Sequence, residues 1–452
     1  MNFLFLSVDS LRPDYVSFLD GDSPTTPFLS TLAETSTVFT HAISPSTWTL
    51  PVHGSIFTGL YPPEHSVSDV DESLGPTDTL AEQLAARGYD TASFAGNGWL
   101  NVGEILRGFD HHHISPPLSR YWVDMVRRGV KERDASAVYI GLSNLGKAPL
   151  DVLREKLVRN NHHDSRIVER YSEYLDGTSE PFFHFVHLNG VHNPYAPHID
   201  QYREFGEGSI FGVRETIQYQ KELIRDRPLL AAGKKRFDNG YEEDIKDLYR
   251  GAIRQTDENV RTIVELLERK GHLEDTVIVV FGDHGDHLGE ENLWGHQFTI
   301  ADEVIRVPLL IRDPSDHLAP SRREDVVQLH DLYCTVLSML GEDCPASHSY
   351  DLSCAKRDTA FAYYSVPESH LERVQRNHQL DTAELPPTKQ FAAWRSPSNR
   401  ATWYPEPDEA TGDSDLLEDL KEHYAALDPI RNQNSAGIDR QTEENLRDMG
   451  YL

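Results

Sequence analysis

The chain has 452 residues, of which 38% are hydrophobic and 26% charged, enough for one large domain with a smaller one or for two to three medium domains. Aspartate and glutamate total 73 against 43 lysine and arginine residues, so the formal net charge is −30. A surface this acidic repels nucleic acid and anionic membranes, which excludes both as expected partners. Only 11 of the basic residues are lysines. From this acidic, lysine-poor composition we expect a halophile-like protein that is stable in concentrated salt and unfolds in dilute buffer.

The chain start and the cysteines indicate a compartment. MNFLFLSVDS has no basic region and too short an apolar run for a secretory signal, and no stretch has the length of a transmembrane helix. We therefore expect a cytoplasmic protein. Cys334, Cys344 and Cys354 are odd in number and have no metal-binding spacing, so we expect small buried thiols rather than a disulfide framework.

The N-terminal part alternates strands and helices. Residues 2–8 (NFLFLSV) form a nearly continuous apolar run, typical of a strand buried on both faces, and Asp9 follows it. Open α/β sheets place their chemistry at such strand ends, although on its own Asp9 is better interpreted as a turn or helix cap. The next predicted elements are a helix over 26–36, a strand over 38–42, a helix over 80–87 and a strand over 89–95. This order predicts a doubly wound sheet.

Residues 47–59 (TWTLPVHGSIFTG) predict the start of a helix behind a group of hydroxyl residues. Backbone N–H groups at a helix start are unpaired and lie at the positive end of the helix dipole, which favours binding of a tetrahedral anion. A hydroxyl here is therefore a candidate nucleophile. The simpler interpretation is that Ser44, Ser46, Thr47 and Thr49 only cap the helix.

The residues from 116 to about 179 differ from the rest of the chain in composition. They are rich in arginine, aspartate and glutamate at amphipathic spacing, which predicts surface helices that form an insertion or lid over the sheet edge. His162 and His163 lie in this polar context, and we expect both to be solvated.

Two buried strands follow this segment. Residues 181–188 (PFFHFVHL) predict a strand in which His184 and His187 have mostly packing roles, and the next loop presents His192 as the stronger functional candidate. After a long helix over 241–270 comes the most apolar strand, residues 276–282. The loop after it is crowded with ionisable residues that no capping or packing requirement explains: Asp283, His284, Asp286, His287, Glu290, Glu291 and His296.

The remaining elements complete a large domain, 1–344, and a C-terminal subdomain, 345–452. The large domain ends with a strand over 305–311 and a helix over 326–340 that Gly341 closes. For the subdomain we predict a small antiparallel sheet from residues 360–365, 391–394 and 401–404, a helix over 414–427 capped by Ser414, and a helix over 441–449.

These strand ends supply ligands for a divalent cation. Two carboxylates, one imidazole and one hydroxyl make a four-ligand set: Asp9, Asp283, His284 and Thr49. The set suits Zn²⁺ or Mn²⁺, with Ca²⁺ or Mg²⁺ as alternatives. The sequence leaves open whether a second ion binds. Such an ion would lower the pKa of the Thr49 hydroxyl and activate it as a nucleophile. The candidates for holding the anion or protonating the leaving group are His53, His192 and His296.

Motifs along nearly the whole chain resemble the sulfatase branch of the alkaline phosphatase superfamily. The matching segments are VDSLRPD, TLPVHGSIFTGLYPPEHSV, TLAEQLAARGYDTASFAGN, HNPY, FGDHGDHLGE with the later GH and IRVPLL, HDLYCTVLSMLG and MGYL. The resemblance implies an alkaline phosphatase-like three-layer α/β/α sandwich with a mostly parallel mixed sheet and a smaller C-terminal α+β subdomain. It also implies that Thr49 is the nucleophile, that His192 and His296 contact the substrate anion, and that the metal ligands are Asp9, Thr49, Asp283 and His284.

The chain departs from the sulfatase pattern at the nucleophile. Sulfatases oxidise a cysteine or serine within Cys/Ser-x-Pro-x-Arg to formylglycine, and that motif falls here on residues 49–53 (TLPVH). Threonine cannot give formylglycine, because oxidation of its secondary carbinol yields a ketone. His53 replaces the arginine that assists the modified residue, Ser10 stands where a second aspartate is usual, and His296 replaces a common lysine. The pair Asp283-His284 resembles phosphodiester-cleaving relatives and phospho-headgroup transferases, several of which use threonine.

The leading hypothesis is a metal-dependent hydrolase that cleaves a sulfate or phosphate ester of a small molecule or glycan through an intermediate on Thr49. The overall resemblance favours sulfate esters, whereas the unmodifiable threonine favours phosphate monoesters or diesters. One alternative is a phosphodiesterase or a transferase that passes a phospho-headgroup to a glycan or lipid. Another is a catalytically idle metal-binding protein, which is disfavoured because all four ligands are present. The sequence leaves the oligomeric state open.

Overall fold

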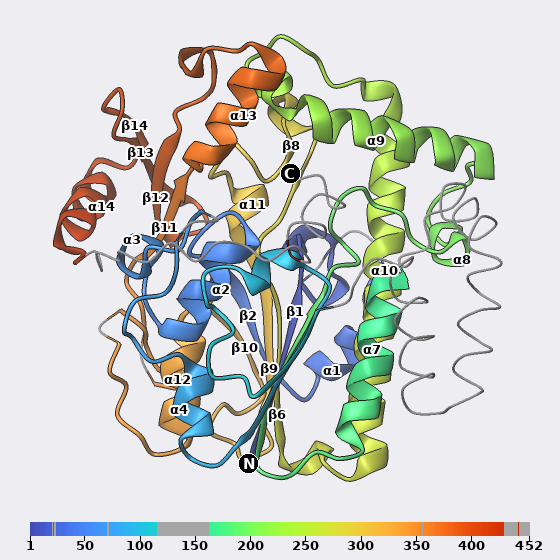
Figure 1. Ribbon diagram of the computed structural model, residues 1–452, viewed down its shortest axis with the longest axis vertical. Coiled ribbons are helices and arrows are strands. Elements are labelled where there is room, and N and C mark those ends of the chain that lie inside the picture. The colour runs from blue at the N-terminus through green and yellow to red at the C-terminus, as the bar shows by residue number, and fades with distance from the viewer. Residues whose placement is uncertain are drawn as a thin grey trace.

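The computed structural model describes residues 1–19, 21, 24–69, 72–114, 162–346, 348–354, 356–428 and 442. A mixed eight-stranded sheet lies at its centre, in the order β10-β2-β9-β6-β1-β5-β3-β4 (Figure 1). The strands are β1 (Asn2–Val8), β2 (Thr37–Ile43), β3 (Asp90–Ala95), β4 (His111–Ile114), β5 (Phe182–Leu188), β6 (Thr276–Gly282), β9 (Arg306–Arg312) and β10 (Ser321–Gln328). Strands β6, β1, β5, β3 and β4 run parallel, whereas β9 is antiparallel to both its neighbours.

Helices cover both faces of the sheet, which gives three layers (Figure 1). One face carries α1 (Pro27–Ala33), α7 (His162–Leu175) and α10 (Glu242–Lys270), and the other carries α2 (Thr49–Thr58), α4 (Leu80–Ala85) and α12 (Asp331–Met339). The alternation along β1 shows why this strand is apolar throughout. Phe3 and Phe5 belong to the cluster with α2, and Leu4 and Leu6 to the cluster with α10.

The edge of the sheet at the carboxyl ends of its parallel strands carries shorter elements. These are α3 (Pro62–His65), α8 (Ile199–Tyr202), α11 (Asp302–Ile305) and the two-stranded pair β7 (His287–Leu288) and β8 (Trp294–Gly295). A longer helix, α9 (Ile210–Ala231), packs against α10, β8 and α13 (Glu368–His378). Neither α9 nor α13 was predicted from the sequence.

A small C-terminal sheet is continuous with the main core. It is antiparallel and consists of β11 (Ala360–Ser365), β12 (Lys389–Ser396), β13 (Asn399–Tyr404) and β14 (Glu409–Gly412), covered by α14 (Ser414–Ala426). Phe391 and Leu416 pack together under α14, whereas Ala392 and Trp394 on the other face of β12 join the cluster beneath α2. The sheet is therefore a subdomain rather than an independent module, as predicted.

Several predicted boundaries were wrong. Residues 326–328 end strand β10, and helix α12 begins only at Asp331, whose Oδ2 accepts a hydrogen bond from Gln328 N at 2.9 Å. A buried strand end and a buried helix are both apolar, so the pattern merged them. The cap of α14 is Asp413, not Ser414, and it accepts from the backbone N–H groups of the first turn. The predicted helix over 441–449 lies outside the described residues, except for position 442.

The expected lid over 116–179 also needs correction. Its last part forms α7, which packs against β3, β5 and α10 and buries Ile167, Tyr171 and Leu175. This part is a layer of the sandwich and not a cover over the sheet edge. Residues 116–161 lie outside the described residues, and so do the side chains of His162 and His163.

The cysteine prediction was wrong as well. Cys334 at the start of α12 and Cys344 after it form a disulfide, with their Cα atoms 5.2 Å apart, and Cys354 is exposed. The spacing of the cysteines carries no signal for this pairing, because it arises from a tight return of the chain after α12.

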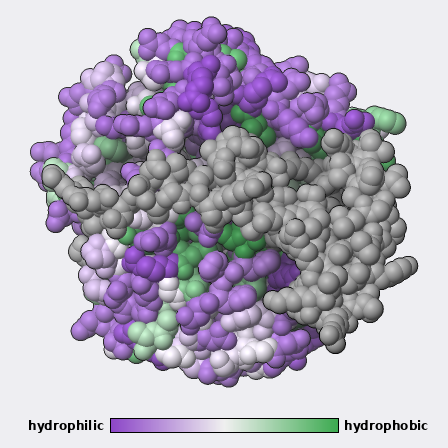
Figure 2. Space-filling model, in the orientation of Figure 1, coloured by the Kyte–Doolittle hydropathy of each residue, from purple (hydrophilic) through white to green (hydrophobic). Residues whose placement is uncertain are grey.

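The surface agrees with the composition. The face of the molecule in Figure 2 is mostly hydrophilic where it is coloured. Within the part of the chain that the structure describes, no helix combines the length and apolar character that crossing a membrane requires.

Candidate active site

Four adjacent strands deliver polar side chains to one end of the sheet. In the parallel register, Val8 of β1 lies between Leu188 of β5 and Gly282 of β6. Asp9 therefore lies beside the Asp283-His284 pair, and both positions are fully buried. This is the strand-end arrangement that open α/β sheets use for their sites.

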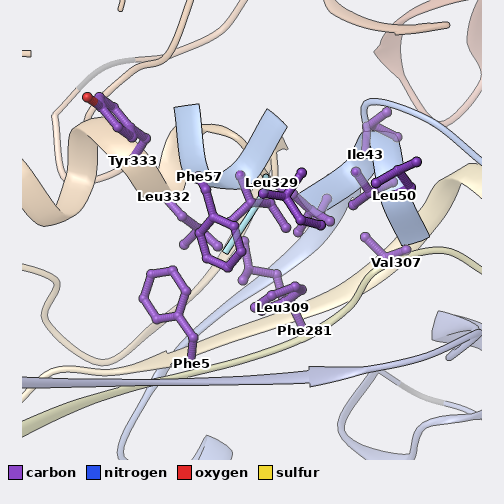
Figure 3. Close-up of a cluster of buried hydrophobic side chains, with 14 of the residues drawn as sticks. Phe5, Ile43, Leu50, Phe57, Phe281, Val307, Leu309, Leu329, Leu332 and Tyr333 are labelled. Atoms are coloured by element: carbon purple, nitrogen blue, oxygen red, sulfur yellow. The ribbon is translucent and has the colours of Figure 1, made fainter. Parts of the chain in front are cut away.

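Helix α2 brings the candidate nucleophile to the same place. Thr49 is its first residue, and all ten residues of the helix are buried. Figure 3 shows Leu50 and Phe57 of α2 inside the core, next to side chains from β1 and β9. The helix ends at Gly59 with φ of 72°, where a Cβ atom would lie 2.7 Å from the Cβ of Ala346. Packing on one side and a required glycine at the end thus fix the position of Thr49.

The capping interpretation of the hydroxyl group is wrong. The N-cap position of α2 is Trp48, and no described side chain caps it. Ser46 Oγ instead donates to the carbonyl of Tyr363 in β11 at 2.8 Å, which ties the loop before α2 to the C-terminal sheet. Thr47 Oγ1 and Ser44 Oγ are buried and have no hydrogen-bond partner in the ranges that the structure covers.

Three of the four predicted metal ligands lie close together. One ligand atom from each of Asp9, Asp283 and His284 lies within 4.8 Å of the others. Among the described residues, Asp283 Oδ2 and His284 Nε2 are buried without a hydrogen-bond partner. Buried polar atoms are rarely unpaired, and two converging on one point fit a cation that the side chains would hold.

Electrostatics at these three residues point the same way. Burial raises the pKa of Asp283 to about 6, and the charge of Asp9 adds to this. Burial would also raise the pKa of Asp9, but the charges of His192 and His284 and the hydrogen bond from His187 outweigh it and lower that pKa. The two carboxylates overcome the effect of burial on His284 and raise its pKa. Burial and the carboxylate of Asp9 thus disfavour the ionised form of Asp283, and a bound divalent cation would offset this effect.

Asn97 connects a predicted metal ligand to the candidate nucleophile. It follows β3, and its Nδ2 donates both to Asp9 Oδ2 at 2.9 Å and to Thr49 Oγ1 at 3.1 Å. Its Oδ1 accepts from Trp99 N at 3.0 Å, which fixes the orientation of the amide. The sequence analysis did not identify Asn97.

His53 and His187 lie behind the metal-ligand set. Ser7 Oγ lies 3.1 Å from both His53 Nε2 and His187 Nδ1, and His187 Nε2 lies 3.3 Å from Asp9 Oδ2. His53 Nδ1 contacts the carbonyl oxygen of Thr49 at 2.8 Å. His53 therefore supports the backbone of Thr49, and His187 packs against His53 and Phe185 as expected but also contacts a predicted metal ligand. His184 does pack, against Phe182, Tyr171 and Tyr174.

A second network positions His296. Its Nδ1 lies 3.0 Å from Asp286 Oδ1, while Asp286 Oδ2 accepts from Asn193 Nδ2 at 2.8 Å and from Tyr195 OH at 2.7 Å. Burial would raise the pKa of Asp286, but the hydrogen bond and the charge of His296 outweigh it and lower that pKa. Burial, with the charge of His284, lowers the pKa of His296 to about 4. Asp286 thus orients a ring that is neutral at pH 7.

His192 lies on the same side of the site. Its ring centroid is 6.0 Å from that of His296, and the His296 ring is 4.5 Å from that of His284. His192 is 7% exposed, and burial lowers its pKa. The structure therefore places Asp9, Asp283, His284, Thr49, His192 and His296 at one end of the sheet.

Comparisons with known proteins agree with this fold. Residues 1–342 match the family model described as Sulfatase. The chain is 24% identical over 317 residues to the ulvan-active sulfatase of Formosa agariphila, covering 69% of this chain and 56% of that protein. It is 25% identical over 342 residues to the choline-sulfatase of Rhizobium meliloti, covering 72% of this chain and 66% of that protein. The chain thus spans between about half and two thirds of the length of these two relatives.

Solved structures extend the comparison at the level of fold. The phosphonate monoester hydrolase of Agrobacterium radiobacter superposes with a TM-score of 0.68 at 19% identity and covers 94% of both chains. The phosphonate monoester hydrolase SpPMH of Silicibacter pomeroyi superposes with a TM-score of 0.69 at 17% identity, covering 97% of this chain and 99% of that one. Both are similar over almost the whole length, including the C-terminal sheet.

Proposed function

Because this chain belongs to the sulfatase family, we propose that it is a metal-dependent hydrolase of sulfate or phosphate esters that uses Thr49 as its nucleophile. One observation carries the proposal. A single amide, that of Asn97, bonds to both the Thr49 hydroxyl and the carboxylate of Asp9, so the nucleophile lies next to the metal-ligand set.

The residues that would hold the cation are Asp9, Asp283 and His284, with the hydroxyl of Thr49 as the fourth ligand. When bound, the ion would lower the pKa of the hydroxyl and neutralise charge on the substrate oxygens. A set of carboxylate and hydroxyl oxygens with one imidazole suits Mn²⁺, Zn²⁺, Mg²⁺ or Ca²⁺, so metal identity is part of the test.

The reaction has two steps. Thr49 Oγ forms a bond to the sulfur or phosphorus atom, the bond to the ester oxygen breaks, and the leaving alcohol takes up a proton. Water then attacks the sulfur or phosphorus atom of the ester on Thr49 and restores the hydroxyl; it releases inorganic sulfate or phosphate from a monoester, a phosphate monoester from a diester, and a phosphonate from a phosphonate ester. The side-chain amide of Asn97 would keep Thr49 Oγ1 in position during both steps, because the hydrogen bond from Trp99 N fixes the orientation of that amide.

His296 and His192 would handle protons and oxygens. With Nδ1–H donated to Asp286, the neutral ring of His296 carries its lone pair on Nε2. Nε2 can therefore take a proton from the attacking group and return it to the leaving oxygen. His192, close to His296 and at the same strand ends, would contact the anion.

The nucleophile bears on which ester is cleaved. A formylglycine hydrate can expel sulfate by collapsing to the aldehyde, and a threonine ester has no such route. This favours phosphate monoesters or diesters over sulfate esters within the proposal. The relatives named as choline- and ulvan-active sulfatases favour sulfate esters of a small molecule or glycan.

The experiment is a substrate and metal screen of the full chain, in dilute and in molar salt. Aryl sulfate, aryl phosphate, aryl phosphonate and bis-aryl phosphate are each tested with Mg²⁺, Ca²⁺, Mn²⁺ and Zn²⁺. We expect turnover of at least one ester and a sulfuryl or phosphoryl mass increase on the peptide that contains Thr49. Thr49→Val should abolish both, whereas Thr47→Val, two residues earlier and equally buried, should retain them.

Two outcomes decide between the alternatives. Transfer of the group to an added alcohol rather than to water would indicate the phospho-headgroup transferase. No turnover of any ester, with metal-induced stabilisation retained in Thr49→Val, would indicate a catalytically idle metal-binding protein and would overturn the proposal.

A further inference from the structure

Arg227 of α9 is a buried cation next to the site that the proposed mechanism does not use. It is 5% exposed, its Nη2 donates to Asn193 Oδ1, and its Nε is buried without a hydrogen-bond partner among the described residues. A Cβ atom on Gly295 would lie 3.1 Å from both Nε and Nη2, so the guanidinium packs against the residue before His296. Burying a cation without a counter-ion is costly, which points to a ligand.

A second arginine and a histidine lie nearby on α13. Arg373 Nη2 donates to His370 Nδ1 at 2.6 Å. Because Nδ1 is the acceptor, the neutral imidazole carries its hydrogen on Nε2. That Nε2 is buried and finds no acceptor in the part of the chain that the structure describes. Burial, followed by the charges of Arg373 and Arg227, lowers the pKa of His370 to about 3, so the ring is neutral at pH 7.

The two arginines repel each other without a compensating ion pair. Helices α9 and α13 pack together above the carboxyl ends of the strands (Figure 1). Burial and the charge of Arg227 lower the pKa of Arg373, and the one opposing charge is that of Asp69, which accepts a hydrogen bond from Ser369 Oγ at 2.8 Å. No carboxylate in the described ranges forms an ion pair with Arg227 or Arg373. In a chain of net charge −30, this is an unusual place to leave two cations together.

We propose that Arg227, His370 and Arg373 form a second anion subsite, next to His296, that binds a further sulfate, phosphate or carboxylate group of the substrate. The inference rests on the proposed function and narrows its substrate to esters that carry at least two anionic groups, one of which is cleaved. Arg227 would donate through Nε, His370 through Nε2, and Arg373 would contribute charge. Arginine suits this role because its charge persists when the group is buried.

Binding of anions that are not cleaved tests the subsite directly. The full chain with its divalent metal is titrated by calorimetry with benzenesulfonate and with disulfonates of increasing spacing: ethane-1,2-, benzene-1,3- and naphthalene-2,6-disulfonate. We expect at least one disulfonate to bind tenfold or more tightly than benzenesulfonate. Arg373→Gln should remove this preference, and Arg376→Gln, an exposed arginine on the same helix, should keep it.

The proposal is overturned if every disulfonate binds within threefold of benzenesulfonate, or if Arg376→Gln loses the preference as fully as Arg373→Gln. Turnover separates this result from failure of the proposed function. If phenyl esters are cleaved at the same kcat/KM as carboxyphenyl esters and no disulfonate is preferred, the subsite proposal is wrong and the proposed hydrolase function stands. If a disulfonate is preferred but no ester is turned over, the subsite proposal stands and the proposed hydrolase function is wrong.

Discussion

Asn97 offers the sharpest test of the site, because it contacts both the proposed nucleophile Thr49 and the predicted metal ligand Asp9. Asn97→Ala deletes the donor to the carboxylate of Asp9 and the donor to the hydroxyl of Thr49. A hydrogen bond to a charged group contributes about 1.5–3 kcal/mol and a neutral one about 1 kcal/mol. We therefore expect the free energy of unfolding to fall by about 3 kcal/mol, since Asn97 is fully buried.

Activity should fall for a separate reason. Without the amide, Thr49 Oγ1 can rotate away from the reacting atom, and a loss of about 1.4–2.7 kcal/mol of transition-state stabilisation corresponds to a tenfold to hundredfold lower kcat. The assay pairs steady-state kinetics on the best ester with urea unfolding. Asn101→Ala is the control, because this exposed residue of the same turn bonds to Thr442 and to no residue of the site in the described ranges. A kcat within threefold of the parent for Asn97→Ala would refute the role of the amide.

Three further predictions concern pH, metal and packing. Burial raises the pKa of Asp164 from 3.8 to about 7, so between these values the folded chain holds a proton that the unfolded chain has lost, and stability falls as pH rises through that window. The substitution Asp164→Asn should flatten this slope and raise the free energy of unfolding of the metal-free protein at pH 8 by up to about 4 kcal/mol. Urea unfolding at pH 4.5, 6 and 8 measures this effect. Parallel pH profiles of the unfolding free energy for the two proteins would contradict the assignment of the slope to Asp164. Removing divalent ions with a chelator should lower Tm, and adding back the ion that restores activity should restore it. At a hundredfold excess of that ion over its Kd, the free energy of unfolding should rise by up to about 2.7 kcal/mol. Asp283→Asn should abolish that response while raising the Tm of the metal-free form, because it removes repulsion with Asp9; an unchanged metal response would exclude Asp283 as a ligand. Gly59→Ala should destabilise by about 2 kcal/mol more than Gly88→Ala in denaturant unfolding, since both have positive φ but the new Cβ at Gly88 meets nothing within 4 Å. Equal losses would mean that backbone conformation alone matters.

The strand-end residues could be predicted from the sequence because the apolar run of a buried parallel strand stops at the first polar residue after the strand. Asp9 and Asp283 each follow a mostly apolar run, and parallel register then places them side by side. The start of helix α2 could be predicted from the hydroxyl residues and the proline near the apolar turns, whereas the choice of Thr49 among those hydroxyl residues came from the resemblance to sulfatases.

Residues that depend on strand order could not be predicted in the same way. Asn97 follows β3 in a stretch that reads as an ordinary turn, and only the pairing of β3 with β5 brings it to Asp9. His187 sits inside an apolar strand, where a histidine usually packs. Asp286 was visible in the acidic and histidine-rich loop, but its role emerges from Asn193 and Tyr195 of another loop. The sequence signal that could have indicated such residues is the excess of polar residues within two positions of each strand end.

Helix α2 makes catalysis and folding compete for the same residues. Every position of the helix is buried, so a substitution that shifts Thr49 also repacks the centre of the protein. Thr49 can therefore change little without loss of stability, whereas the exposed side chains of α9 and α13 can change at small cost to the core. If Thr49 is the nucleophile, divergence of this chain toward a new ester should therefore change the exposed side chains of α9 and α13 and leave Thr49 and helix α2 unchanged.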